Sequence, residues 1–112
     1  MKTEVTVSWK AFSSAERAIE NRKVFPVKEA TVYAPFFDYL TELEICNKVY
    51  QETNLYYGKF WNQLERVLPE NRSHTALSIG DEVTITRQNA AITYRCAELG
   101  WEEVGVKVGT GI

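Results

Sequence analysis

The chain has 112 residues, of which 45% are hydrophobic and 25% are charged, and its formal net charge is -2. This length is typical of a single domain, and the apolar content suffices for a core without disulfides or metals. The slight negative charge argues against a general attraction to nucleic acid or to an anionic membrane. No apolar run approaches the roughly 18 residues that a membrane-spanning helix needs.

The two cysteines, Cys46 and Cys96, both lie within apolar patterns. A short chain stabilised by disulfides would need more cysteines, and free cysteine is among the most buried residue types. We therefore expect two reduced core cysteines and a cytoplasmic protein, because reduced thiols are typical of that compartment. The N-terminal residues 1–4 lack a signal-peptide pattern, which favours the same location.

The N-terminal third is predicted to contain two strands separated by a short helix. Residues 4–10 alternate between polar and apolar side chains, which is typical of a half-buried strand. Ser13 and Glu16 form a capping-box pattern for a helix over 14–22, which ends before Pro26. Residues 27–34 alternate again, and Pro35 then favours an edge or an exit of the sheet.

The longest predicted helix begins near Asp38 or Thr41 and ends near Asn54. Thr41 and Glu44 form a second capping-box pair, and asparagine is a common left-handed helix end. Helical spacing places on the apolar side Leu40, Leu43, Cys46, Val49 and Tyr50, and on the solvent side Glu42, Glu44, Lys48 and Glu52.

An aromatic turn over residues 56–61 leads into a second short helix, which ends before Pro69. The predicted inward side chains of this helix are Phe60, Leu64, Val67 and Leu68. The simplest interpretation of the aromatic turn is packing over the core. The functional alternative is an aromatic platform for a nucleic-acid base or for a side chain of a partner.

Three further strands are predicted after the loop 69–80, over residues 82–87, 91–98 and 101–108. The middle strand buries Ile92, Tyr94 and Cys96, so Arg95 should be exposed on its other side. The predicted fold is therefore α+β: a mostly antiparallel sheet of two N-terminal strands and a C-terminal three-strand meander, with one main helix and one or two short helices. We expect a single domain over residues 1–108 and a flexible tail over 109–112.

No motif in the sequence supports catalysis or metal binding. A nucleophile needs an adjacent base and an orienting group, zinc needs more cysteine and histidine than the chain holds, and there is no phosphate-binding loop. We therefore expect no enzyme activity, no cofactor and no metal. A pairing of Cys46 or Cys96 with the single histidine, His74, is conceivable but is not required by any spacing.

The polar loop before residue 82 is the better candidate for a binding site. Its donors suit an anionic or polar ligand, and they are Arg72, Ser73, His74, Thr75 and Ser78. The same groups could instead satisfy the backbone of a compact loop. Other candidate contacts for a ligand or partner are Asn54, Trp61, Arg95 and Trp101.

Several segments carry a resemblance: residues 46–54 (CNKVYQETN), Trp61, residues 72–83 (RSHTALSIGDEV), residues 94–97 (YRCA) and Gly100-Trp101. Together they resemble a family of small uncharacterised proteins of phages, plasmids and other mobile elements, often of actinobacteria. Its usual form is a helix ending in Thr-Asn, a Trp, an S-L-S-V-G-D-V-V segment and a C-terminal Gly followed by Trp or Phe. The likeness covers about residues 38–104. The chain differs from the usual form of the family in having Ile79 in place of Val and an additional helix over 60–68.

The resemblance implies a mobile-element accessory protein that acts in a host cytoplasm by binding, for example as an inhibitor of host or defence machinery. The expected partner is a host protein or a small anionic ligand, with no membrane, and a homo-oligomer is compatible with the sequence. The alternative is a nucleic-acid-binding regulator that uses a sheet face with Arg87, Arg95 and Lys107. A small enzyme centred on Cys96 or His74 and a purely structural role are the remaining hypotheses.

Overall fold

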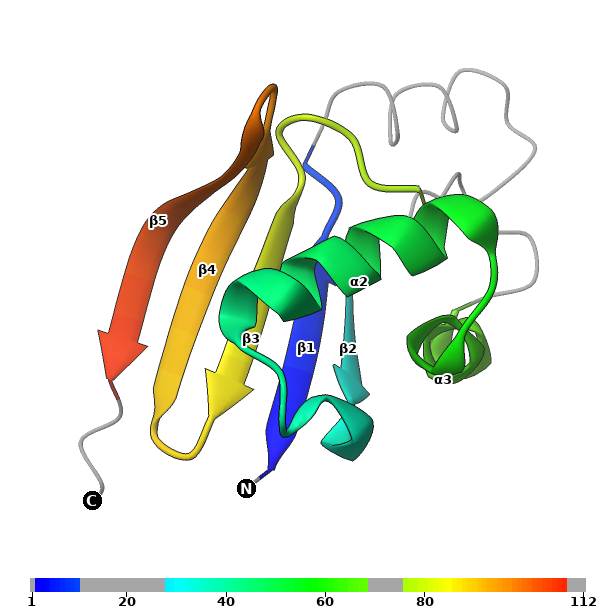
Figure 1. The fold of residues 1–112 in the computed structure, drawn as a ribbon, viewed down its shortest axis with the longest axis horizontal. Helices are drawn as coiled ribbons and strands as arrows, with labels where there is room; N and C mark the ends of the chain where they lie inside the picture. Colours follow the sequence, from blue (N-terminus) through cyan, green and yellow to red (C-terminus); the bar gives the residue numbers. More distant parts are fainter. Residues whose placement is uncertain (1, 11–27, 69–75, 109–112) are drawn as a thin grey trace.

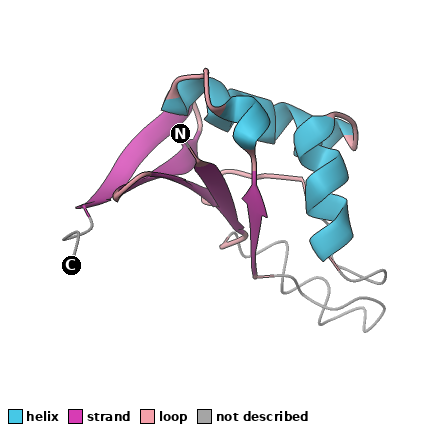
Figure 2. Cartoon of the chain, turned by 90° about the horizontal axis from the view of Figure 1, so that it is seen from below, coloured by secondary structure: helices cyan, strands magenta, loops and turns pink. Residues whose placement is uncertain are grey.

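The computed structural model describes residues 2–10, 28–68 and 76–108. It confirms the predicted α+β class: a five-stranded antiparallel sheet carries its helices on one face (Figure 1, Figure 2). The elements are β1 (Thr3–Ser8), β2 (Glu29–Tyr33), the 3-10 turn η1 (Pro35–Phe37), α2 (Glu42–Leu55), α3 (Lys59–Val67), β3 (Glu82–Arg87), β4 (Ala90–Ala97) and β5 (Gly100–Val108). The helix predicted over 14–22 and the tail 109–112 lie outside the described residues.

The strands of the sheet have the order β2-β1-β3-β4-β5, so β1 lies between β2 and β3. Val5 is paired with Val32 of β2 on one side and with Ile85 of β3 on the other, and all three side chains are buried. The alternation in the sequence therefore produced the expected half-buried strand, because successive side chains point to opposite faces. The prediction for Pro35 is also confirmed, since β2 is an edge strand and Pro35 begins η1.

The capping box of α2 forms as predicted. The Glu44 N–H donates to Thr41 Oγ1 at 3.2 Å, and the Thr41 N–H donates to Glu44 Oε1 at 2.9 Å. The helix ends at Leu55, close to the predicted Thr53-Asn54, but the left-handed residue is Tyr56, with φ 55° and ψ 45°, and not Asn54 as predicted. Asn54 stays in the last turn, where its side chain donates to the Tyr50 carbonyl at 2.8 Å.

The buried face of α2 is rotated from the predicted one. Leu43 and Tyr50, predicted to face inward, are 50% and 43% exposed. The buried side chains are Ile45, Cys46, Val49, Glu52 and Thr53. The prediction that Glu52 faces solvent was therefore also wrong. In α3, Phe60 and Leu64 are buried as predicted, whereas Val67 is 56% exposed.

The C-terminal meander has the predicted order, and its second and third strands begin one residue early. A two-residue turn joins β3 to β4, and its first residue, Gln88, has φ 52°. The pairing of β4 with β5 shifts register between Thr93 and Tyr94. This β-bulge changes which residues of β5 share a face.

The two faces of the sheet differ in chemistry. The face under α2 and α3 is apolar and contains Val5, Val7, Val83 and Ile85. The other side, which we call the outer face, carries cross-strand threonine pairs such as Thr84 Oγ1 with Thr93 Oγ1 at 2.8 Å. No helix of the described residues has the length and apolar character needed to cross a membrane.

Candidate binding cleft

The polar loop favoured by the sequence is described only from residue 76 onward, so Arg72, Ser73, His74 and Thr75 lie outside the described residues. The remaining candidate, Ser78, belongs to a tight turn. Its N–H donates to Asp81 Oδ2 at 2.8 Å, and its carbonyl accepts from the Asp81 N–H at 2.9 Å. The turn is joined to β4, because the Gly80 N–H donates to the Cys96 carbonyl at 2.8 Å. Both hydrogen bonds of Ser78 use its backbone, and they help to form the turn that precedes the meander.

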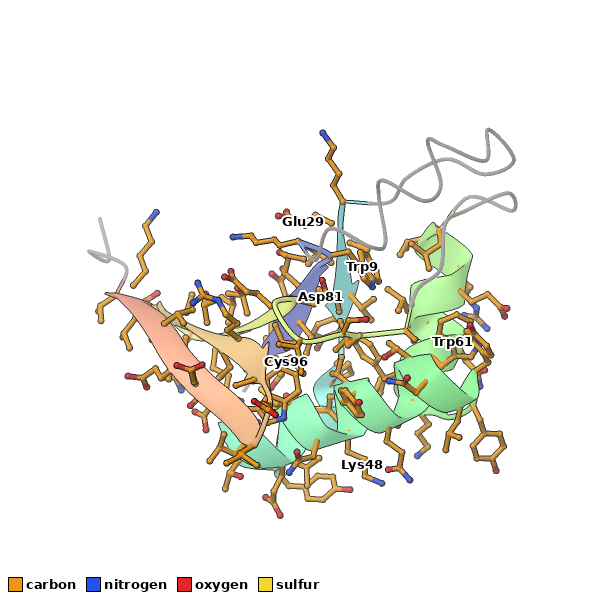
Figure 3. The ribbon with its side chains drawn as sticks, turned by 90° about the horizontal axis from the view of Figure 1, so that it is seen from above. Trp9, Glu29, Lys48, Trp61, Asp81 and Cys96 are labelled. Carbon is orange, nitrogen blue, oxygen red and sulfur yellow. The ribbon has the colours of Figure 1, made fainter. Side chains whose placement is uncertain are left out.

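Trp61 and Trp101 lie on different elements and are not brought together. Trp61 is only 4% exposed, and its ring lies 5.0 Å from the Tyr56 ring at the corner between α2 and α3. Trp101, at the start of β5, is partly buried and donates from Nε1 to Asn47 Oδ1 at 3.1 Å. Figure 3 shows Trp61 beside α3, away from Cys96, the strand partner of Trp101.

Arg95 is separated from both tryptophans, since it lies on the outer face of the sheet. Its Nη2 contacts Glu82 Oε2 at 3.1 Å, and its side chain is 47% exposed, as predicted. Asn54 is exposed at the end of α2. The described members of the predicted binding set therefore occupy several separate places in the fold.

The structure instead forms a cleft of about 730 Å³ between η1, the end of α2 and the start of α3. Its lining residues are Phe36, Phe37, Tyr39, Leu40, Lys48, Gln51, Glu52, Leu55, Tyr56, Tyr57, Gly58, Lys59 and Asn62. The aromatic turn over 56–61 was singled out as a possible platform, and it supplies one wall. The wall from residues 36–40 was missed, because only the tertiary fold places it opposite this turn.

The cleft has an aromatic floor and an exposed aromatic rim. Phe37 is 4% exposed and stacks on the buried Phe60 at 5.8 Å between ring centroids, which fixes the floor. Around the rim, Tyr39 is 84% exposed and Tyr57 is 78% exposed. Exposed apolar groups gathered at one place are typical of a binding surface, whereas single scattered ones are not informative.

Two lysines supply the positive charge of the cleft. Lys48 and Lys59 are both exposed, and neither has an ion-pair partner within the described parts of the chain. In Figure 3, Lys48 projects from α2 away from the sheet. Glu52 is the single carboxylate of the lining, and it is buried in a structural contact.

That contact caps α3. Gly58 is the N-cap residue and has no side chain to accept a hydrogen bond, so the Glu52 carboxylate takes this role and accepts from the Trp61 N–H at 3.1 Å. A negative group is favourable there, because the first turn of a helix presents unpaired N–H groups and a partial positive charge. The cap ties the end of α2 to the start of α3 and so fixes the angle between two walls of the cleft.

The two cysteines have raised pKa values. Both are free and buried, as predicted. Burial, with smaller contributions from Glu42 and Cys96, raises the pKa of the Cys46 thiol to about 12. Burial and the nearby Asp81 also raise the pKa of Cys96. Both thiols therefore stay protonated at neutral pH, and the thiolate is the reactive form. No group of three potential metal ligands occurs within the described segments.

The nucleic-acid alternative predicted three basic residues on one face of the sheet, and for Arg87 this prediction was wrong. Arg87 lies on the helix side, where Nη2 donates to the Phe37 carbonyl at 2.7 Å and also to the Leu40 carbonyl. It therefore holds η1 against β3 and is not presented on the outer face with Arg95 and Lys107.

Comparisons with protein-family models, curated proteins and solved structures found no match for this chain.

Proposed function

We propose that the protein acts by non-covalent binding, and that the cleft takes a small anionic ligand with a flat ring, of the nucleotide class. The observation that carries this proposal is the combination of an aromatic lining with two lysines that have no ion-pair partner among the described residues. The volume of about 730 Å³ falls within the range of roughly 300–1,000 Å³ that is usual for small-molecule sites.

Different lining residues would contact the base and the phosphates of such a ligand. A base can stack on the exposed rings of Tyr39, Tyr56 or Tyr57, and stacking on an aromatic side chain is worth about 1–3 kcal/mol per base. Lys48 and Lys59 suit phosphate oxygens as point charges. The side-chain amides of the cleft add hydrogen-bonding groups that can read the edge of a ring.

The start of α3 is not the anion site in this proposal. Helix N-termini often bind phosphate, but here the Glu52 carboxylate already accepts from the Trp61 N–H. A ligand phosphate would have to displace this buried carboxylate. We therefore place the negative groups of the ligand at the lysines, on the solvent side of the cleft.

A second candidate is the docking of a host protein on the same rim, favoured by the exposed Tyr39, Leu55 and Tyr57. Either function agrees with the resemblance to accessory proteins of mobile elements. From that resemblance we propose that this protein acts in a host cytoplasm. The two candidates differ in their occupant and not in the surface that they use.

The test is a panel of mono- and dinucleotides, measured by thermal shift and then by calorimetry. We expect a member of the panel to bind, Lys48→Ser and Lys59→Ser each to weaken its binding roughly threefold to tenfold, and Tyr57→Ala to weaken it about fivefold or more. Lys28→Ser is the matched control, because Lys28 is exposed and outside the cleft lining. Failure of every nucleotide to bind, or equal binding by all variants, would refute the nucleotide proposal.

A further inference from the structure

The strand β5 is an edge of the sheet, with no further described strand beside it. It runs over nine residues and, among the described strands, pairs only with β4 (Figure 1). Its C-terminal half lies away from α2, and Val106 and Val108 are 55% and 68% exposed although they lie on the helix side of the sheet. A long edge strand with exposed valines is able to accept another strand.

The β-bulge determines which side chains of β5 share a face. Glu102 is paired with Arg95 and Lys107 with Ala91, so both lie on the outer face. Trp101 is paired with Cys96, and Val108 with Ala90, so both lie on the helix side. Without the register shift, residues separated by five positions would lie on opposite faces of a strand.

We propose that β5 pairs antiparallel with β5 of a second copy of this chain, with Glu102 opposite Lys107 of the second copy. The two-fold symmetry of such a pair forms this ion pair twice. In the same register, Trp101 lies opposite Val108 of the second copy, on the helix side. This contact also occurs twice and covers the most exposed valine of the strand.

The charged side chains of β5 favour a second copy of this chain as the pairing strand, and they favour this register. Glu102 and Lys107 both project from the edge strand, and neither has an ion-pair partner within the described residues. A shift of two residues would place Glu102 opposite Gly105, or Lys107 opposite Val104, and would lose both ion pairs. The strand is therefore complementary to itself in one register, which an unrelated strand would match only by chance.

The experiment is sedimentation equilibrium on the full chain from micromolar to millimolar concentration. We expect a reversible dimer. Lys107→Glu should weaken it at least roughly tenfold, because two attractive cross-strand pairs become repulsive. The double variant Glu102→Lys with Lys107→Glu should restore the dimer, because it exchanges the charges without changing the net charge.

The control is Lys28→Glu, which changes the net charge as Lys107→Glu does but lies outside β5. Circular dichroism establishes that each variant is folded. A wild-type chain that stays monomeric at millimolar concentration would overturn the proposal. So would a dimer that Lys107→Glu leaves unchanged, or one that the charge exchange fails to restore.

Discussion

Substitution of Gly58 by alanine tests the corner that shapes the cleft. Gly58 has φ 122° and ψ 172°, a backbone region that is essentially restricted to glycine and costs other residues about 1–3 kcal/mol. An added Cβ would also lie 2.2 Å from the Cδ and Oε1 atoms of Glu52. The carboxylate would have to move and would leave the Trp61 N–H without its acceptor.

The expected loss follows from these two effects. Loss of the Glu52 acceptor from a buried N–H costs about 1–3 kcal/mol, which together with the about 1–3 kcal/mol of backbone strain gives roughly 2–6 kcal/mol. This is a large part of the about 5–15 kcal/mol that stabilises a typical domain. At about 3–6 °C per kcal/mol for a domain of this length, Tm should fall by about 6–36 °C.

Two other glycines serve as matched controls. Gly100 has φ 126° but no atom within 4 Å of an added Cβ, so Gly100→Ala measures backbone strain alone. Gly105 has neither a positive φ nor a close neighbour, so Gly105→Ala should change stability by less than about 1 kcal/mol. The order of destabilisation should be Gly58, then Gly100, then Gly105.

The assay is urea unfolding followed by circular dichroism and tryptophan fluorescence. In a Glu52→Ala background the steric conflict is absent, so the cost of Gly58→Ala should fall to that of Gly100→Ala. If Gly58→Ala is no more destabilising than Gly100→Ala in the wild-type background, the proposed cap by Glu52 is refuted.

Four further predictions concern other parts of the structure. Arg87→Met should lower the free energy of unfolding by about 2–3 kcal/mol in urea titrations, because two carbonyls of the η1 segment lose their donor; an unchanged midpoint would contradict this. Gln88→Gly should raise stability by about 0.5–1 kcal/mol, measured as Tm, since glycine adopts the positive φ of this turn position without strain. Burial raises the pKa of Glu82, but hydrogen bonds from its two basic partners outweigh this effect and lower the pKa overall. Its stabilisation is therefore present above the unfolded pKa of about 4.3 and is lost as the pH falls through the lower folded value, so Glu82→Gln should flatten the acid side of a stability profile. Finally, Cys46 and Cys96 should resist a thiol reagent at pH values near 8 and react after denaturation; rapid labelling of the native protein would show that the thiols are accessible.

Local sequence patterns determined most of the elements. The alternation in β1 and the capping box at Thr41 depend only on neighbouring residues, and both are present in the structure. The order of the meander followed in the same way from short apolar strands and the turns between them. These features need no knowledge of the rest of the chain, because their geometry repeats every two residues in a strand and every 3.6 residues in a helix.

Only the tertiary structure decided the rotation of α2 and the location of the cleft. Two apolar stripes overlap on this helix at Cys46 and Val49, and the stripe that faces the sheet continues into the polar Glu52 and Thr53. Glu52 can be buried there because the Trp61 N–H of α3, a separate element, donates to its carboxylate and offsets its desolvation. The cleft likewise joins residues 36–40 to residues 55–62 across the end of α2, which no local pattern can indicate.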